Sequence, residues 1–223
     1  MLKIIIKIFD SILNFIYPNR CVFCQELMAI NEEESICKYC YTDIDFICDD
    51  KEPKLAVFSY DEKTRYAIFR LKYDNQKQYA KVFAKMMYYK LLKIDISKYD
   101  YIIYVPMYIK KKKKRGYDQA EVIACELSKL CGIPIENNNL IRIKNTLPQS
   151  KVSFEKRSEN VKDAFYVKNP SRINNKNILL IDDIYTTGNT INYCAKELKK
   201  AGANNICYFT LAKTIYKKDL ENN

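Results

Sequence analysis

A stretch in the last quarter of the chain combines acids, hydroxyl residues and a glycine. Asp182 and Asp183 follow the four aliphatic residues 178–181 and precede a short polar run. That run is Thr186, Thr187, Gly188, Asn189 and Thr190. We expect the aliphatic residues to form a buried strand that ends at the two acids. The polar run should then turn into a helix, whose unpaired N–H groups and positive dipole favour a phosphate group.

The two acids narrow the choice of ligand. Two carboxylates beside a phosphate cradle would repel a bare polyphosphate, so we expect them to accept hydrogen bonds from sugar hydroxyls or to organise a magnesium shell. Gly188 would permit close approach of the backbone. The pattern therefore predicts a site for a sugar that carries a phosphate. An alternative stays open, because similar strand and turn patterns occur where the first aspartate caps a helix or binds a metal in phosphatase and response-regulator folds.

Four cysteines have the spacing of a metal site. Cys21, Cys24, Cys37 and Cys40 give C-x2-C-x12-C-x2-C, and such pairs can surround one tetrahedral zinc ion with four thiolates. The segment is too short to build its own core, so we expect the metal to have a structural role and to contribute folding free energy. Disulfide bonds are the less favoured alternative, and Cys48 is either a spare ligand or a plain thiol.

Composition sets broad limits. With 223 residues and 48% hydrophobic content, the chain can form one main domain and a small annex. The formal net charge of +11 favours polyanionic partners, although nucleotide bias in the genome would also enrich lysine. The six cations at 110–115 either lie in solvent or serve a ligand at the end of the preceding strand.

The first seventeen residues show apolar positions at helical spacing, interrupted by charged and polar residues. This predicts an amphipathic helix that packs on its own domain or docks on a membrane surface or a partner. The apolar runs are too short for a signal peptide or a membrane span, so we expect a cytoplasmic protein.

Hydrophobic periodicity predicts an α/β domain with a parallel sheet covered by helices on both faces. Strands are expected at 55–60, 101–105, 177–184 and 206–212, with helices at 64–72, 77–93, 117–130 and 190–201. Gly132 and Gly202 are expected as helix C-caps, whereas Gly116 and Gly188 are expected where backbone approaches something closely. Residues 144–160 are polar and aperiodic, which predicts a long functional loop. We place the domain boundary between 1–52 and 53–223.

Thirteen residues from Ile178 to Thr190 resemble the phosphoribosyl pyrophosphate (PRPP) signature of type I phosphoribosyltransferases. Together with "FIYPNRCVFC", "CKYC", "LKYDNQ", "VPMYIKKKKKRGYDQAEVIACELS" and "LPQSKVSFEKRSENVKDAFYV", the chain resembles the ComF family. Members of that family join a zinc-ribbon-like module to a phosphoribosyltransferase-like domain. The family usually has Arg-Gly-Phe-Asn-Gln where this chain has Asp118 in the fourth position, which argues against phosphate contact by that side chain.

The resemblance implies a site for PRPP with magnesium. Asp182 and Asp183 would contact the ribose hydroxyls and stabilise positive charge at C1, and the turn 186–190 would hold the 5-phosphate. Arg115 and some of Lys110 to Lys114, Lys114 included, would neutralise the pyrophosphate. Arg157 would close over the site from the predicted loop.

Two functions of different classes remain open at this stage. One is a PRPP-dependent transferase linked to DNA uptake in natural competence. The other is a single-stranded DNA-binding protein that retains a non-catalytic PRPP site and works with other competence proteins. A nucleobase salvage transferase is less favoured, because no base-specificity segment is evident and the zinc module has no obvious use in salvage.

Overall fold

The computed structural model describes residues 19–28, 35–48, 52–73, 76–146 and 162–215. The predicted amphipathic helix at residues 1–17 and Arg157 lie outside the described residues. Among the described helices, none is both long and apolar enough to cross a bilayer.

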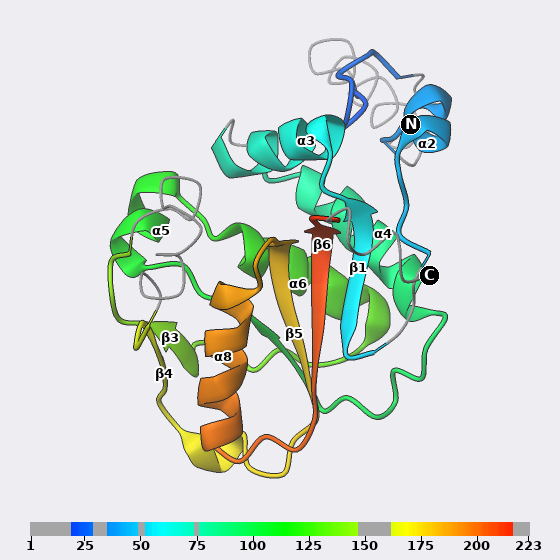
Figure 1. The fold of residues 1–223 in the computed structure, drawn as a ribbon. Coiled ribbons are helices and arrows are strands. Elements are labelled where there is room, and N and C mark those ends of the chain that lie inside the picture. Colours follow the sequence, from blue (N-terminus) through cyan, green and yellow to red (C-terminus); the bar gives the residue numbers. More distant parts are fainter. Residues whose placement is uncertain (1–18, 29–34, 49–51, 74–75, 147–161, 216–223) are drawn as a thin grey trace, which may run out of the picture.

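The main sheet has four parallel strands in the order β1-β6-β5-β2 (Figure 1). The strands are β1 (Lys54–Ser59), β2 (Tyr101–Tyr104), β5 (Ile178–Tyr185) and β6 (Ile206–Lys213). All four match predicted strands, because short aliphatic or aromatic runs without polar alternation are typical of strands buried on both faces. In β5, Ile178 to Ile181 have no exposed surface.

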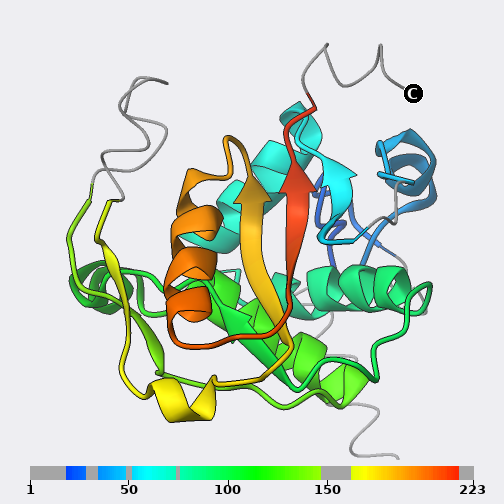
Figure 2. The ribbon, with the colours of Figure 1, turned by 60° about the horizontal axis from the view of Figure 1, so that its bottom comes forward.

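Helices cover both faces of the sheet, and each face has its own apolar core. α4 (Tyr79–Leu91) and α6 (Gln119–Cys131) pack on one face, and α8 (Asn189–Lys200) packs on the other (Figure 2). Leu179 and Ile181 belong to the first core, whereas Ile178 and Leu180 belong to the second. This alternation follows from the two-residue period of a strand. The expected doubly covered parallel sheet is therefore confirmed.

Shorter elements lie around the carboxyl ends of the strands. Figure 1 shows α3 (Glu62–Tyr73) and α5 (Ile109–Arg115) toward the end of the sheet to which the arrows point. A separate antiparallel pair, β3 (Leu140–Arg142) and β4 (Phe165–Val167), flanks α8 and is followed by the 3-10 turn η2 (Pro170–Arg172). The predicted loop 144–160 joins β3 to β4, and only residues 144–146 of it are described.

The cysteine segment shares the core of the main domain. The Phe23 ring lies 5.5 Å from the ring of Phe58 in β1 and 6.4 Å from that of Phe83 in α4, measured between centroids. Arg70 of α3 donates a hydrogen bond of 2.9 Å to the carbonyl of Val22. α2 (Lys38–Asp43) carries the second cysteine pair. The segment is therefore joined to the domain by aromatic packing as well as by the chain.

Two local expectations were wrong. The strand does not end at the two acids: β5 continues to Tyr185, because β6 runs beside it and pairs Asp182 with Thr210 and Tyr185 with Lys213. Gly116 does not stand in an open loop; it ends helix α5 with φ +90°, and a β-carbon there would meet no protein atom within 4 Å. Gly132 caps α6 as expected, with φ +77°, and Gly202 directly follows the cap of α8.

Candidate functional site

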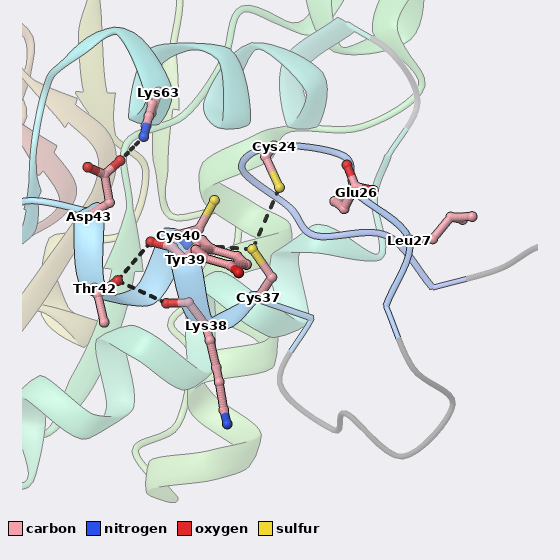
Figure 3. A pocket seen from close by; sticks show the side chains of 10 residues that line it. All are labelled: Cys24, Glu26, Leu27, Cys37, Lys38, Tyr39, Cys40, Thr42, Asp43 and Lys63. Carbon is pink, nitrogen blue, oxygen red and sulfur yellow. Dashed lines mark hydrogen bonds and ion pairs between the residues drawn. The ribbon is translucent and has the colours of Figure 1, made fainter.

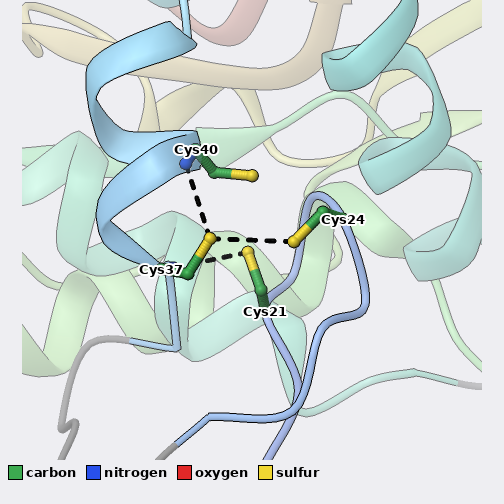
Figure 4. A group of neighbouring side chains, drawn as sticks. All are labelled: Cys21, Cys24, Cys37 and Cys40. Carbon is green, nitrogen blue, oxygen red and sulfur yellow. Dashed lines mark hydrogen bonds between the residues drawn. The ribbon is translucent and has the colours of Figure 1, made fainter.

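The four predicted cysteines converge on one point (Figure 4). Their sulfur atoms all lie within 4.8 Å of one another, and Sγ of Cys24 is 3.7 Å from Sγ of Cys37. A tetrahedral zinc site with Zn–S bonds of about 2.3 Å has sulfurs about 3.8 Å apart. The donor set and its spacing thus fit zinc, with four thiolates and no position left open.

Backbone amides support the sulfur atoms. The amide of Cys37 donates to Sγ of Cys21, and the amide of Cys40 donates to Sγ of Cys37, both at 3.4 Å. Although burial opposes ionisation, hydrogen bonds from the backbones of Cys37, Cys24 and Phe23 lower the pKa of the Cys21 thiol to about 7. Cys48 is exposed and outside the cluster, and its thiol donates to the carbonyl of Phe46 at 3.7 Å. The four-cysteine assignment is confirmed, and the spare thiol does not reach this cluster.

An open pocket of about 860 Å³ lies beside the cysteines (Figure 3). Its lining includes Tyr39, which is 86% exposed, and an ion pair between Lys63 of α3 and Asp43 of α2. The ion pair joins the metal segment to the first turn of α3. Cys24, Cys37 and Cys40 line this pocket, whereas Cys21 has no exposed surface.

Asp183 lies near the carboxyl end of β5, and two side chains contact its Oδ2. Nζ of Lys72 in α3 is 2.6 Å from Oδ2 of Asp183, and Nε2 of Gln119 in α6 donates to the same oxygen at 2.9 Å. Burial alone would lower the pKa of Lys72, but the charges of Asp183 and Asp182 raise it above its ordinary value. The ammonium group therefore stays charged at neutral pH and neutralises Asp183.

Asp182 faces the other side of the sheet. Its Oδ1 accepts a hydrogen bond of 2.8 Å from the amide of Asp183, and it interacts electrostatically with Cys194 of α8 and with Arg142 of β3. Burial, followed by the charge of Asp183, raises the pKa of Asp182 well above its usual range. The two acids are thus placed on opposite faces, as neighbours in a strand must be, and they do not form one carboxylate pair.

The turn after β5 leads into α8 as predicted. Gly188 precedes the helix with φ +74°, and a β-carbon there would collide with the hydroxyl of Tyr185. Thr186 and Thr187 are half-buried in the bend. α8 begins at Asn189, so the positive end of its helix dipole lies at this turn. The predicted glycine-containing turn ahead of a helix is present, and phosphate binding there stays a prediction.

The cations predicted to bind pyrophosphate differ in their surroundings: Arg115 contacts Gln119, which also contacts Asp183, and Lys114 faces solvent. The guanidinium of Arg115 donates to Oε1 of Gln119 and stacks on the ring of Tyr73 at 4.8 Å. Lys114 is exposed, whereas Lys111 donates to the carbonyl of Thr146. Because the run folds as helix α5, its side chains point in several directions and only some can serve one ligand.

Asp118 does not point toward a ligand. Its two carboxylate oxygens accept the amides of Met107, at 2.6 Å, and of Ala120, at 3.0 Å, so it caps α6. Asparagine and aspartate are both good N-caps, but only aspartate offers two acceptor oxygens to two converging amides. The aspartate that replaces the motif's asparagine at this position therefore has a structural role as the N-cap of α6.

The carboxyl of Asp118 is expected to titrate near pH 6. Burial raises its pKa to about 6, although the amides of Met107 and Ala120 oppose the shift. The pKa of Asp118 is higher in the folded protein than the unfolded value of about 3.9, so its protonated form favours the folded state. This contribution to stability is fully present below about pH 4 and is lost as the pH rises through about 6. Carbon-13 NMR of the carboxyl checks the value. In parallel, the stability of the wild type relative to Asp118→Asn should fall between pH 4 and 7; a carboxyl titrating near 4 would contradict the expectation.

Sequence reasoning missed three residues at this edge. Lys72, Gln119 and Arg142 come from three different elements and meet the acids only in the folded chain. Lys72 stands in "LKYDNQ" and Gln119 in "RGYDQ", two segments that carried the family resemblance without an assigned role. A lysine on the last turn of a predicted helix was the only local signal for Lys72.

Two family models match successive parts of the chain. The phosphoribosyl transferase domain model matches residues 83–222, and the double zinc ribbon domain model matches residues 12–54. A purine phosphoribosyltransferase from Pyrococcus horikoshii aligns at a TM-score of 0.39 and 18% identity, over 61% of this chain and 84% of that chain. Structural similarity at this TM-score supports no statement about the residues of the site.

Three similar proteins have names that mention competence or DNA utilization. Competence protein F of Haemophilus influenzae is 29% identical over 79% of this chain and 84% of that protein. The DNA utilization protein YhgH of Salmonella typhimurium is 23% identical over 72% of each chain. Competence protein ComFC of Streptococcus pneumoniae is 29% identical over 71% of this chain and 67% of that protein. The phosphoribosyl transferase domain, the zinc ribbon ahead of it and these relatives together place the chain in the ComF family.

Proposed function

We propose that the protein binds PRPP with magnesium at the turn between β5 and α8, and that it acts in DNA uptake during natural competence. The observation that carries the binding proposal is the start of α8. Two half-buried threonines and a glycine at φ +74° follow the end of β5, and α8 begins directly after them, so that the positive end of its helix dipole lies at this turn. The names of the competence and DNA utilization relatives support the cellular role.

The parts of PRPP would be divided among the neighbouring elements. The 5-phosphate would accept the amides at the start of α8, and the ribose hydroxyls would donate to the carboxylate of Asp182. Arg115, at the end of α5, supplies positive charge for the pyrophosphate. Magnesium, held by pyrophosphate oxygens and water, would neutralise the departing anion.

The first experiment is a calorimetric titration of PRPP with magnesium into the wild type, Gly188→Ala and Gly132→Ala. Both glycines have φ near +75°, so both variants carry a similar cost in backbone conformation, but only Gly188 belongs to the turn, where an added β-carbon would also displace the Tyr185 side chain. We expect Gly188→Ala to lose at least about tenfold in affinity and Gly132→Ala to bind as the wild type does. Equal affinities in the two variants would contradict the proposed turn. Pyrophosphate release measured with nucleobases and amines then shows whether an acceptor is used.

A second candidate function, binding of single-stranded DNA, is favoured by one face of α3. Tyr66, Phe69 and Tyr73 recur at helical spacing and are 48%, 49% and 58% exposed. The rings of Phe69 and Tyr73 lie 4.6 Å apart, and Arg65 stacks on Tyr66 at 5.2 Å. Exposed aromatics beside cations form the stacking platforms that hold bases of single strands. α3 lies toward the same end of the sheet as α5 (Figure 1).

Binding of an oligothymidylate at several salt concentrations tests the second function. Phe69→Ala together with Tyr73→Ala should weaken binding by about tenfold or more, since stacking contributes about 1–3 kcal/mol per base. Tyr166→Ala is the control, because Tyr166 of β4 is 52% exposed and distant in the chain from α3. Equal loss in the control, or affinity independent of salt, would exclude this role for α3.

A further inference from the structure

Arg70 of α3 bonds to the turn between the first two cysteines. Its guanidinium donates to the carbonyl of Val22 at 2.9 Å and also to the carbonyl of Phe23. These two residues separate Cys21 from Cys24. Nε of Arg70 is buried and has no hydrogen-bond partner among the described residues. The two carbonyls are therefore the hydrogen-bond acceptors that the described structure gives to a half-buried cation.

The cysteine cluster holds those carbonyls in place. The sulfurs of Cys21 and Cys24 belong to the four that lie within 4.8 Å of one another. The carbonyl of Cys21 accepts the backbone amide of Gln25 at 2.9 Å and its side-chain amide at 2.8 Å. Tyr79 of α4 donates to Oε1 of Gln25 at 3.1 Å. A metal ion bound by the four thiolates ties both ends of the turn to one point, so the turn offers its carbonyls to Arg70 in one arrangement.

The next residues of α3 bond to a different part of the molecule. Lys72 forms the 2.6 Å ion pair with Asp183 of β5, and the carbonyl of Leu71 accepts the hydroxyl of Tyr117. Residues two apart in a helix do not face the same neighbour, so Arg70 and Lys72 connect α3 to different elements. The last turn of α3 is thus held by the cysteine turn on one side and by the main domain on another.

We propose that Arg70 is a positioning residue that couples zinc binding in the cysteine segment to the placement of the last turn of α3. Without the metal, the turn between the cysteines can change conformation. A half-buried guanidinium then loses its acceptors, which costs free energy, so the last turn of α3 should loosen. Because such coupling is reciprocal, removal of the guanidinium should in turn weaken zinc binding. The inference needs no PRPP site and is tested apart from the proposed function.

Zinc affinity, measured by competition with a chromogenic chelator, tests the coupling from one side. Arg70→Met keeps an unbranched apolar stem and removes both hydrogen bonds, so its zinc affinity should fall by about tenfold or more. Arg70→Lys should lose less, because an ammonium group can still donate to a carbonyl. Arg65→Met is the matched control, since Arg65 is exposed on the same helix and lies over the ring of Tyr66 at 5.2 Å. Equal zinc affinities of Arg70→Met and Arg65→Met would overturn the proposal.

Hydrogen exchange tests the coupling from the other side and starts from the unaltered chain. Removal of zinc from the wild type by a chelator should speed exchange at the amides of residues 69–73 by about tenfold or more. Arg70→Met with zinc bound should show faster exchange at the same amides, whereas Arg65→Met should not. The amides of α8, which packs in the core on the opposite face of the sheet, should keep their rates. Unchanged exchange at 69–73 after zinc removal, or equal acceleration in α8, would overturn the proposal.

Discussion

Replacing Cys40 with serine is expected to remove the bound zinc and to lower the thermal midpoint of the whole protein by about 10 °C or more. Metal binding contributes about 10–16 kcal/mol to folding in small zinc modules, and part of that energy is lost with one of four thiolates. Cys40 is buried, and the segment packs on Phe58 through Phe23, so the loss reaches the main core. Elemental analysis and a thermal melt of the reduced protein measure both effects.

Cys48→Ser is the matched control for this variant. Cys48 is exposed and lies outside the four-sulfur cluster, so this variant should keep about one zinc per chain and the wild-type melting curve. Equal zinc content in the wild type, Cys40→Ser and Cys48→Ser would contradict the assignment of the metal ligands.

Replacing Phe58 with alanine is expected to cost about 3–5 kcal/mol of unfolding free energy. Phe58 is fully buried in β1, and its ring contacts both Phe23 and Phe46, at 5.5 and 5.3 Å between centroids. Its removal should also loosen the metal segment, so that zinc exchanges faster with a chelator. Urea unfolding and the rate of zinc loss to a chromogenic chelator measure the two effects.

Phe69→Ala provides the comparison for Phe58→Ala. The same side chain is removed, but Phe69 is 49% exposed on α3, so the stability should change by less than about 1 kcal/mol. Similar losses in the two variants would show that β1 does not connect the metal segment to the domain core.

The order of elements could be predicted well from the sequence because their signals are local. The run from Ile178 to Ile181 and the strands at 101–105 and 206–212 are continuously apolar, and buried parallel strands have that pattern. The spacing of the four cysteines is equally local, and the structure confirms that they converge. Helix caps at Gly132 and near Gly202 followed from the same reasoning.

The pairing of side chains across elements could not be predicted. Lys72 and Asp183 are far apart in the chain, and nothing beside either residue indicates a 2.6 Å ion pair. The sequence also presented Asp182 and Asp183 as one acidic pair, because their adjacency hides the fact that strand neighbours face opposite sides. The extra length of β5 depends on β6, a strand that comes later in the chain, so the acids themselves could not reveal it.

The structure of two polar segments also could not be predicted from the sequence. The cations at 110–115 fold as helix α5 and not as an open loop, which separates the exposed Lys114 from Arg115 at the site edge. Asp118 stands where the family motif has asparagine. From the sequence alone, its charge bore only on whether the side chain contacts phosphate. Its two backbone partners, one of them Met107, became evident only in the folded loop.

The measurement that tests the central claim most directly is a nitrogen-15 NMR titration of the protein with ribose 5-phosphate. If the turn after β5 holds the phosphate, the amide signals of Gly188 to Ile191 should shift the most, because helix N–H groups that gain a phosphate acceptor change their shielding. Signals of the α5 lysines should move less. Saturating ligand that leaves the amides of 188–191 unmoved would contradict the account.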